Sequence, residues 1–231
     1  MGALARTVHA PNSLRVLAGL LGYPDAGMRR YLGDMRVTLH AECALTPARL
    51  AELDVLIDSL SEADALETEA NYVHLFDRGR ATSLHLFEHV HGDSRDRGPA
   101  MIDLAQTYEK SGLYLAPGEL PDYLPVVLEF VSTQPPREAR DFLGEMAHIF
   151  NAIFSALQQR QSAYASVIGA LLELAGETAQ AVKLAPEEPL DESWVEPVVF
   201  DGCSSKGQAR PGQPQPVHIV RKHKSSQGAS S

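Results

Sequence analysis

The chain has 231 residues, of which 44% are hydrophobic and 22% charged. At roughly 150 residues per domain, this length allows one or two domains with a sizeable core, which excludes a disulfide-stapled miniprotein. The two cysteines are Cys43 and Cys203, and the sequence contains no CxxC motif. We therefore expect a reducing compartment and no iron–sulfur or thiolate zinc site built within one chain.

Charge is divided unevenly along the chain. Residues 1–200 contain 15 Lys and Arg against 29 Asp and Glu, a net charge of −14. Residues 201–231 carry five basic residues and one acid, a net charge of +4, which leaves −10 for the whole chain. An acidic body repels the phosphates of nucleic acids and attracts basic segments of proteins. We therefore expect protein partners and no nucleic acid.

Insertion into a membrane is not expected. The longest run without Asp, Glu, Lys or Arg covers fourteen residues, 146–159, whereas a membrane span needs roughly 20 apolar residues. The N-terminus lacks a basic region followed by an apolar stretch and a cleavage site, so a secretory signal is not expected either. We predict a cytoplasmic protein without stable membrane association.

Apolar residues recur at helical spacing up to about residue 180, without sustained period-two alternation and without a repeat of fixed spacing. Prolines and capping residues mark where helices begin. The expected helices cover about 14–21, 28–39, 47–60, 61–76, 84–90, 99–112, 121–131, 136–157 and 162–178. The pattern predicts an all-α, single-domain helical bundle.

The character of the sequence changes after Lys183, where proline, glycine, serine and glutamine become frequent. We expect an all-helical domain at 1–184, a proline-rich strap at 185–200 and a disordered basic tail at 201–231, because the tail has too little apolar surface to offset its ordering entropy. The strap is expected to pack back on the domain through Trp194, Val198, Val199 and Phe200.

The run HLFEH at 85–89 matches H-x-x-E-H, the inverted zinc-protease motif. On a helix, His85 and His89 lie one turn apart and present both imidazoles to one metal, while Glu88 can activate a bound water. This pattern supports a zinc hydrolase as the alternative function. In the other interpretation, the same helix exposes these three polar residues and buries three apolar ones, Leu84, Phe87 and Val90.

Two further segments carry charged residues next to expected helix starts. HGDSRDRG at 91–98 contains two carboxylates that favour a helix N-terminus and two arginines that can pair with carboxylates, although a solvated loop explains it as well. ELPDYLP at 119–125 places Asp122 between two prolines, where it can cap a helix. Neither a Ser-His-Asp nor a Cys-His arrangement is recognisable, so we expect no catalytic residues.

Three runs carry a family resemblance: LLGYPD (20–25), YVHLFDRGRATSLHLFEHVHGDSRDRGPAMIDL (72–104) and ELPDYLPVVLEF (119–130). In this order on a helical chain, they resemble the nitrate reductase molybdenum-cofactor assembly chaperones, also called the delta subunit or NarJ family. This family belongs with the TorD/DmsD redox-enzyme maturation proteins. The resemblance spans roughly residues 12–180 and implies an all-helical fold without a cofactor of its own.

The resemblance also implies a function. Such a protein binds the N-terminal segment of the nitrate reductase catalytic (alpha) subunit in the cytoplasm and keeps the apoenzyme competent for insertion of the molybdenum bis-guanine-dinucleotide cofactor. It delays docking on the membrane anchor subunit and is absent from the finished enzyme. The alpha–beta complex and the cofactor-insertion machinery are further partners that the resemblance implies.

Carried over by position, the family's motifs imply a client-binding set. Its members are Tyr72, Phe76, Asp77, Glu88, His89, His91, Gly92, Asp93, Arg95, Asp96, Arg97, Glu119, Pro121, Asp122 and Tyr123. A helical client with an apolar face and basic residues needs an apolar groove with acidic rims. The rims would speed encounter and select against acidic partners, while a few buried anchors supply affinity.

Overall fold

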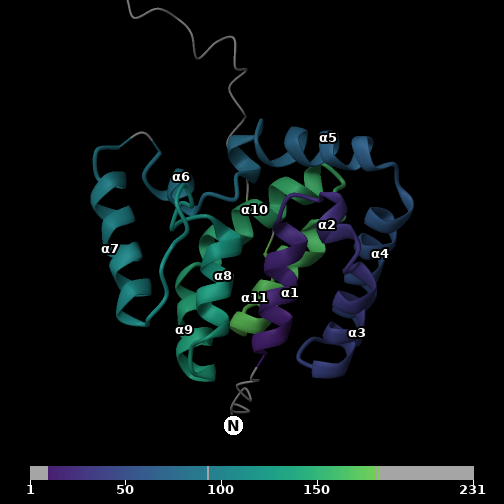
Figure 1. Ribbon diagram of the computed structural model, residues 1–231, viewed down its shortest axis with the longest axis horizontal. Coiled ribbons are helices and arrows are strands. Elements are labelled where there is room, and N and C mark those ends of the chain that lie inside the picture. The colour runs from purple at the N-terminus through teal and green to yellow at the C-terminus, as the bar shows by residue number, and fades with distance from the viewer. Residues whose placement is uncertain (1–9, 93, 181, 183–231) are drawn as a thin grey trace, which may run out of the picture. The chain divides into compact units, whose positions relative to one another are not determined.

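The computed structural model describes most of the chain, namely residues 10–92, 94–180 and 182. All of these residues belong to one unit of the chain. Asp93, the expected strap at 185–200 and the expected tail at 201–231 lie outside the described residues. In the described part, eleven α-helices and one 3₁₀ turn make up the regular structure and no strand is present (Figure 1). The expected all-helical class is confirmed.

The elements are α1 (Pro11–Leu21), α2 (Ala26–Arg29), α3 (Leu32–Glu42), α4 (Pro47–Glu62), α5 (Ala65–Phe76), the 3₁₀ turn η1 (Arg80–Thr82), α6 (Leu86–Val90), α7 (Arg97–Lys110), α8 (Leu124–Ser132), α9 (Pro136–Glu145), α10 (Ala147–Gln159) and α11 (Ala165–Ala175). None of the helices in these described segments combines the length and the apolar character that crossing a lipid bilayer requires.

The core is built around α1 and α11. α1 packs chiefly against α8, and also against α3 and α11, while α11 packs against α10, α9 and α4 (Figure 1). α1 buries the leucines that its spacing predicts, Leu14, Leu17, Leu20 and Leu21. α11 is buried on nearly all sides, which is typical of a helix whose residues are apolar all round.

Two predicted helix starts are confirmed. α4 begins at Pro47 after Thr46, whose hydroxyl accepts a hydrogen bond from the N–H of Arg49 at 3.3 Å. α9 begins at Pro136. In both helices proline occupies the first position, where the missing N–H costs no intrahelical hydrogen bond.

Two predicted helices are each divided in the structure. The segment expected at 28–39 forms α2 and α3, and the segment expected at 136–157 forms α9 and α10. The second break lies at Met146, which has φ −89° and ψ −1° and whose N–H donates to the carbonyl of Leu143. Leu143, before the break, and Phe150, after it, are both buried in the core. Periodicity alone does not reveal such a break, because apolar spacing continues through it.

The helix expected from Ser61 begins later, at Ala65. α4 runs on to Glu62, and the Asp64 carboxylate then accepts hydrogen bonds from the next helix at 2.9 and 3.2 Å. Asp64 is therefore the N-cap of α5, and its side chain satisfies N–H groups that have no partner within the helix.

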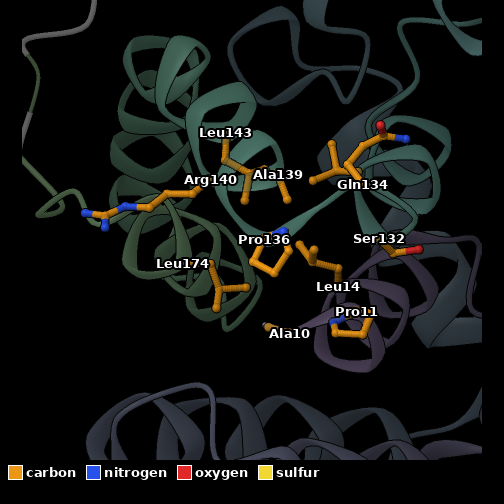
Figure 2. Close-up of a pocket in the computed structure, with 11 residues that line it drawn as sticks. Ala10, Pro11, Leu14, Ser132, Gln134, Pro136, Ala139, Arg140, Leu143 and Leu174 are labelled. Carbon is orange, nitrogen blue, oxygen red and sulfur yellow. The ribbon is translucent and has the colours of Figure 1, made fainter. Parts of the chain in front are cut away.

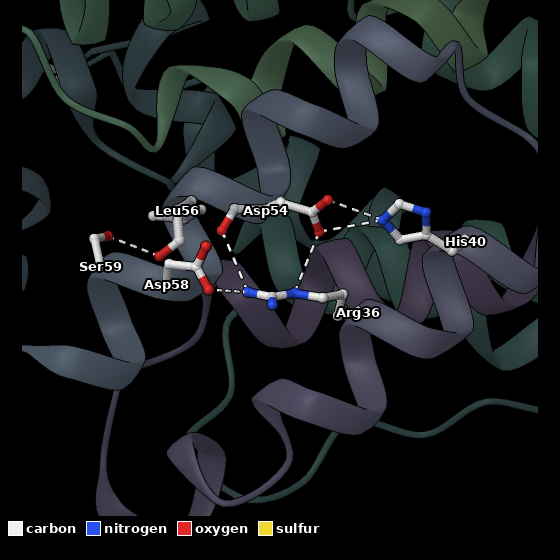
Figure 3. Close-up of polar contacts among 6 residues, drawn as sticks. All are labelled: Arg36, His40, Asp54, Leu56, Asp58 and Ser59. Carbon is white, nitrogen blue, oxygen red and sulfur yellow. Dashed lines mark hydrogen bonds and ion pairs between the residues drawn. The ribbon is translucent and has the colours of Figure 1, made fainter.

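α3 and α4 are joined by an ion-pair network on the surface (Figure 3). Arg36 pairs with Asp54, with 3.3 Å between Nε and Oδ1, and also with Asp58. Nε2 of His40 lies 3.0 Å from Oδ2 of Asp54. Exposed pairs of this kind contribute only about 0–1 kcal/mol each, so the network adds little to the stability of the α3–α4 packing.

A small cavity lies where α1, α8, α9 and α11 meet (Figure 2). Its volume is about 20 Å³, and Leu14, Leu143 and Leu174 are among its lining residues. This space holds about one water molecule. It is therefore a packing defect of the core, too small to bind a peptide or a cofactor.

Leu17 is fully buried in the core, and we expect Leu17→Ala to lower the free energy of unfolding by about 2–5 kcal/mol, because it leaves a cavity. Val55 on α4 is 62% exposed, so Val55→Ala should change stability by no more than about 0.5 kcal/mol. Urea unfolding followed by circular dichroism measures both. Equal effects of the two substitutions would contradict the assignment of α1 to the core.

Candidate functional site

Asp122 is fully buried and connects the charged motifs of the chain. Its Oδ2 accepts a hydrogen bond from the N–H of Phe87 at 3.2 Å, and its Oδ1 lies 3.3 Å from Nδ1 of His85. Nη2 of Arg97 lies 3.8 Å from Asp122 Oδ2 and 3.6 Å from Oε1 of Glu88. A carboxylate withdrawn from water needs such partners. The segment before α6, the start of α7 and the turn before α8 are thereby joined.

The main chain supports the same junction. His85 and Tyr123 form an isolated antiparallel bridge, with N–H to carbonyl hydrogen bonds of 3.0 and 2.8 Å on either side. Because residues 121 and 122 form a turn and Tyr123 is extended for this pairing, α8 begins at Leu124 and the start expected at Pro121 is wrong.

The HLFEH motif does not form the helical face that its spacing predicts. α6 spans only Leu86–Val90, so His85 lies before the helix, and its ring faces the carboxylate of the turn before α8. Nε2 of His89 donates to the carbonyl of Ser83 at 2.8 Å. The predicted burial is confirmed at Leu84 but wrong at Val90, which is 52% exposed. Across the described segments, no three His, Cys, Asp or Glu side chains are placed to hold a metal.

The charged turn at 91–98 shapes the approach to α7. Gly92 has φ +51°, a conformation that favours glycine. The hydroxyl of Ser94 donates to Asp96 Oδ2 and accepts from the Asp96 N–H, both at 3.2 Å. α7 then begins at Arg97, two residues earlier than expected. Asp96 and Arg97 of this turn therefore have structural partners, Ser94 for the first and Glu88 and Asp122 for the second.

The side chains of His91, Arg95 and Glu119 make no hydrogen bond or ion pair with Asp122. The His91 ring packs edge-on against Phe87 at 5.4 Å, and Arg95 is exposed. Glu119 is exposed, and its Oε2 accepts a hydrogen bond from the N–H of Ala116 at 2.8 Å. Pro121 is buried, and its carbonyl accepts from the hydroxyl of Tyr108 at 2.8 Å.

Tyr72 is at the centre of an aromatic cluster. Its hydroxyl donates to the carbonyl of Leu21 at 2.7 Å and lies 3.2 Å from the hydroxyl of Tyr123. Because a phenol has one proton to donate, Tyr123 is the donor to Tyr72 in this second contact. Burial raises the pKa of Tyr72 and keeps it neutral. The ring of Phe76 packs between Tyr72 and Tyr164, at 4.8 and 5.0 Å.

This cluster forms one side of a pocket of about 280 Å³, which we name the aromatic pocket. Its lining residues are Tyr23, Tyr72, Phe76, Asp77, Leu84, His85 and Tyr123. Asp77 is exposed at the end of α5. The pocket therefore has aromatic and apolar walls and one carboxylate.

A second pocket of about 570 Å³, which we name the α1–α8 pocket, adjoins the first because His85 and Tyr123 line both. α1 contributes only small residues, Ala18 and Gly19. The other lining residues come from the end of α1, the turn before α8 and α8 itself: Gly22, Gly118, Glu119, Leu120, Pro125, Val126 and Glu129. None of the described residues that line either pocket is Lys or Arg.

The structure separates the predicted client-binding residues into two groups. Five of them line the two pockets: Tyr72, Phe76, Asp77, Glu119 and Tyr123. The others that are described line neither: Glu88, His89, His91, Gly92, Arg95, Asp96, Arg97, Pro121 and Asp122. Asp93 lies outside the described residues. Within the motifs, Arg97 pairs with Glu88 and Asp122, while Asp77, Arg95, Asp96 and Glu119 are exposed.

Several pocket residues are not among the client-binding residues that the motifs predict. Ala18 and Gly19 on α1 and Val126 and Glu129 on α8 line the α1–α8 pocket, although the resemblance assigns them no role. Leu120 is 44% exposed there. Two adjacent small residues on an otherwise leucine-rich helix were the sequence signal for a pocket at this position. Only the packing of α1 on α8 shows which pocket they line.

The two histidines of the motif have opposite pKa shifts. The hydrogen bond with Asp122 raises the pKa of His85 above its ordinary value of 6.5, although burial opposes this. Burial lowers the pKa of His89, although the hydrogen bond to Ser83 opposes this. Protonation therefore strengthens the His85 contact and destabilises the surroundings of His89.

We expect His85→Gln to destabilise the protein more at about pH 5.5 than at about pH 8. A raised pKa in the folded state means that the stabilisation is complete below the unfolded value of about 6.5 and is lost as pH rises through the folded value. Urea unfolding at both pH values tests this. The control is His74→Gln, at an exposed position on α5, which should change stability by no more than about 0.5 kcal/mol. An effect of His85→Gln that is larger at high pH would contradict the sign.

Comparison with known proteins shows a clear relationship. Residues 43–168 match the sequence profile described as the nitrate reductase delta subunit. Over 180 residues, the chain is 43% identical to the nitrate reductase molybdenum cofactor assembly chaperone NarJ of Escherichia coli K12, which covers 78% of this chain and 76% of that protein. NarW of the same strain is 40% identical over 163 residues, or 71% of this chain and 68% of that one.

The fold is shared more widely. A crystal structure from Archaeoglobus fulgidus, described as a redox enzyme maturation protein, matches with a TM-score of 0.54 and 20% identity over 77% of this chain and 100% of that chain. That likeness concerns the fold alone. The family expected from the motifs is confirmed by the profile match and by the identity to NarJ. The chain therefore belongs to the nitrate reductase delta subunit family.

Proposed function

We propose that the protein is an assembly chaperone of a respiratory nitrate reductase and binds the N-terminal segment of the catalytic (alpha) subunit in the cytoplasm. Binding keeps the apoenzyme competent for insertion of the molybdenum cofactor and delays its docking at the membrane, and the chaperone is absent from the finished enzyme. The 43% identity to a relative named for molybdenum cofactor assembly supports this proposal. The alpha–beta complex and the cofactor-insertion machinery are proposed as further partners.

The observation that carries the proposal is the pair of adjoining pockets. Their walls are apolar and aromatic, and the charged side chains among the described lining residues are Asp77, Glu119 and Glu129. Apolar walls accept the anchors of an amphipathic helix, and carboxylates favour basic residues beside those anchors. A basic, amphipathic N-terminal segment is therefore the occupant that fits these pockets.

The geometry supports stoichiometric binding better than turnover. His85 faces Asp122, and His89 is hydrogen bonded to a carbonyl, so the two rings do not converge on one point. The zinc hydrolase alternative therefore has no supporting geometry in the described residues. Tyr72 and Asp122 are buried and hydrogen bonded within the fold, so substituting them would disturb the fold as well as any bound peptide.

Leu120 offers a cleaner test, since it is 44% exposed and lines the α1–α8 pocket. We expect Leu120→Ser to weaken binding of a peptide copying the client N-terminus by roughly tenfold, because covering a leucine side chain is worth about 1.5 kcal/mol or more. Isothermal titration calorimetry gives the affinity, and native mass spectrometry gives the stoichiometry, expected to be one peptide per chain.

The matched control is Leu66→Ser, because Leu66 is 75% exposed and lines neither pocket. It should bind the peptide as the wild type does. In cells that lack the chaperone, the wild type and Leu66→Ser should restore the molybdenum content of the purified catalytic subunit, and Leu120→Ser should restore less. A wild-type protein that ignores the peptide, or a molybdenum content that does not depend on the chaperone, would refute the proposed function.

A further inference from the structure

A third pocket extends the α1–α8 pocket along α8. Its volume is about 400 Å³, and it shares Glu119, Val126 and Glu129 with the α1–α8 pocket. Leu113 and Leu115 of the loop after α7 add to its apolar lining. The three pockets thus follow one another from the end of α5 to the end of α8, and Glu129 lies at a junction between two of them.

Glu129 differs from the other charged residues around this junction. Arg15 Nε donates to the hydroxyl of Ser132 at 3.1 Å, and Glu119 accepts from the Ala116 N–H at 2.8 Å. The carboxylate of Glu129 is exposed and makes no hydrogen bond or ion pair with any residue that the structure describes. It is the carboxylate at the junction that has no partner among the described residues.

The place of Glu129 on α8 makes a cation still more favourable. It lies in the last turn of this helix, Leu124–Ser132. The C-terminal end of a helix carries a partial negative charge, so an acidic side chain there is repelled and a cation is attracted. A lysine or arginine brought to this point by a partner would meet both the carboxylate and the helix end.

Val126 lies one turn before Glu129 and is half-buried in the lining of both pockets. The two residues are separated by about 4.5 Å along the helix axis. In a helical peptide, side chains three or four residues apart have nearly the same separation. A peptide helix can therefore place an apolar side chain on Val126 and a basic one at Glu129 together.

We propose that Glu129 is the specificity-determining residue of this surface. It selects a helical segment that carries a lysine or arginine one turn from the apolar side chain seated on Val126. This inference rests on the proposed function, since it assigns the charge and spacing that the chaperone requires of its client. Affinity then comes mainly from the apolar contacts, and Glu129 decides which amphipathic helices are accepted.

The test uses the full chain and a fluorescent peptide that copies the N-terminus of the cognate catalytic subunit, with affinity measured by anisotropy. We expect Glu129→Gln to weaken binding about three- to fivefold, as loss of an exposed ion pair does, and Glu129→Arg to weaken it about tenfold or more. The wild-type affinity should fall between about 50 and 300 mM salt, and that fall should be smaller in Glu129→Gln.

Glu145 provides the matched control, because it is also an exposed glutamate at the end of a helix, α9, and lines none of the three pockets. Glu145→Gln and Glu145→Arg should bind the peptide within about twofold of the wild type. Circular dichroism of all four variants should match the wild type, since both positions are exposed.

A charge exchange identifies the partner residue. Each lysine or arginine of the peptide is replaced in turn by glutamate, and one such peptide should bind poorly to the wild type and regain affinity with Glu129→Arg. If the wild type binds the peptide but the Glu129 variants match the Glu145 variants and no exchange restores binding, this inference is wrong and the proposed function stands. If the wild type does not bind the peptide, both are wrong.

Discussion

A buried carboxylate is the constraint on which the functional face depends. Asp122 is withdrawn from solvent and is held by the N–H of Phe87, by His85 and by Arg97. A buried charge is tolerated only with close polar partners, and removing one partner leaves the others unsatisfied. The segment before α6, the start of α7 and the turn before α8 must therefore keep one arrangement for the fold to persist.

That arrangement determines where the aromatic pocket and the α1–α8 pocket lie. The bridge between His85 and Tyr123 brings both rings to the boundary between the aromatic pocket and the α1–α8 pocket. α1 meets this boundary with Ala18 and Gly19. Gly19 has no side chain, and Met35 of α3 packs where a Cβ at that position would lie. Glu88, Arg97 and Asp122 thus hold this part of the fold together, and the linings of the two pockets come chiefly from α1, α5, α8 and the turn before α8.

The charged and the apolar side chains that line these pockets contribute differently to binding. The apolar and aromatic walls provide area that a partner can cover, which is the main source of affinity in such interfaces. Asp77, Glu119 and Glu129 add one sign of charge beside those walls, and complementary charge chiefly governs encounter and choice of partner. This division agrees with the function proposed above for a member of the nitrate reductase delta subunit family.

The sequence by itself determined the helical class, the inner face of α1, the starts of α4 and α9, and the family, because each depends on local spacing or on a contiguous motif. It did not determine that His85 precedes α6, that residues 136–157 form two helices, or that Asp122 is buried. The Asp122–His85 contact joins residues 37 positions apart. Such contacts, and the pockets beside them, are determined only by the tertiary structure. Helical spacing shows which side of a segment is apolar, but it does not show which distant segment packs against that side.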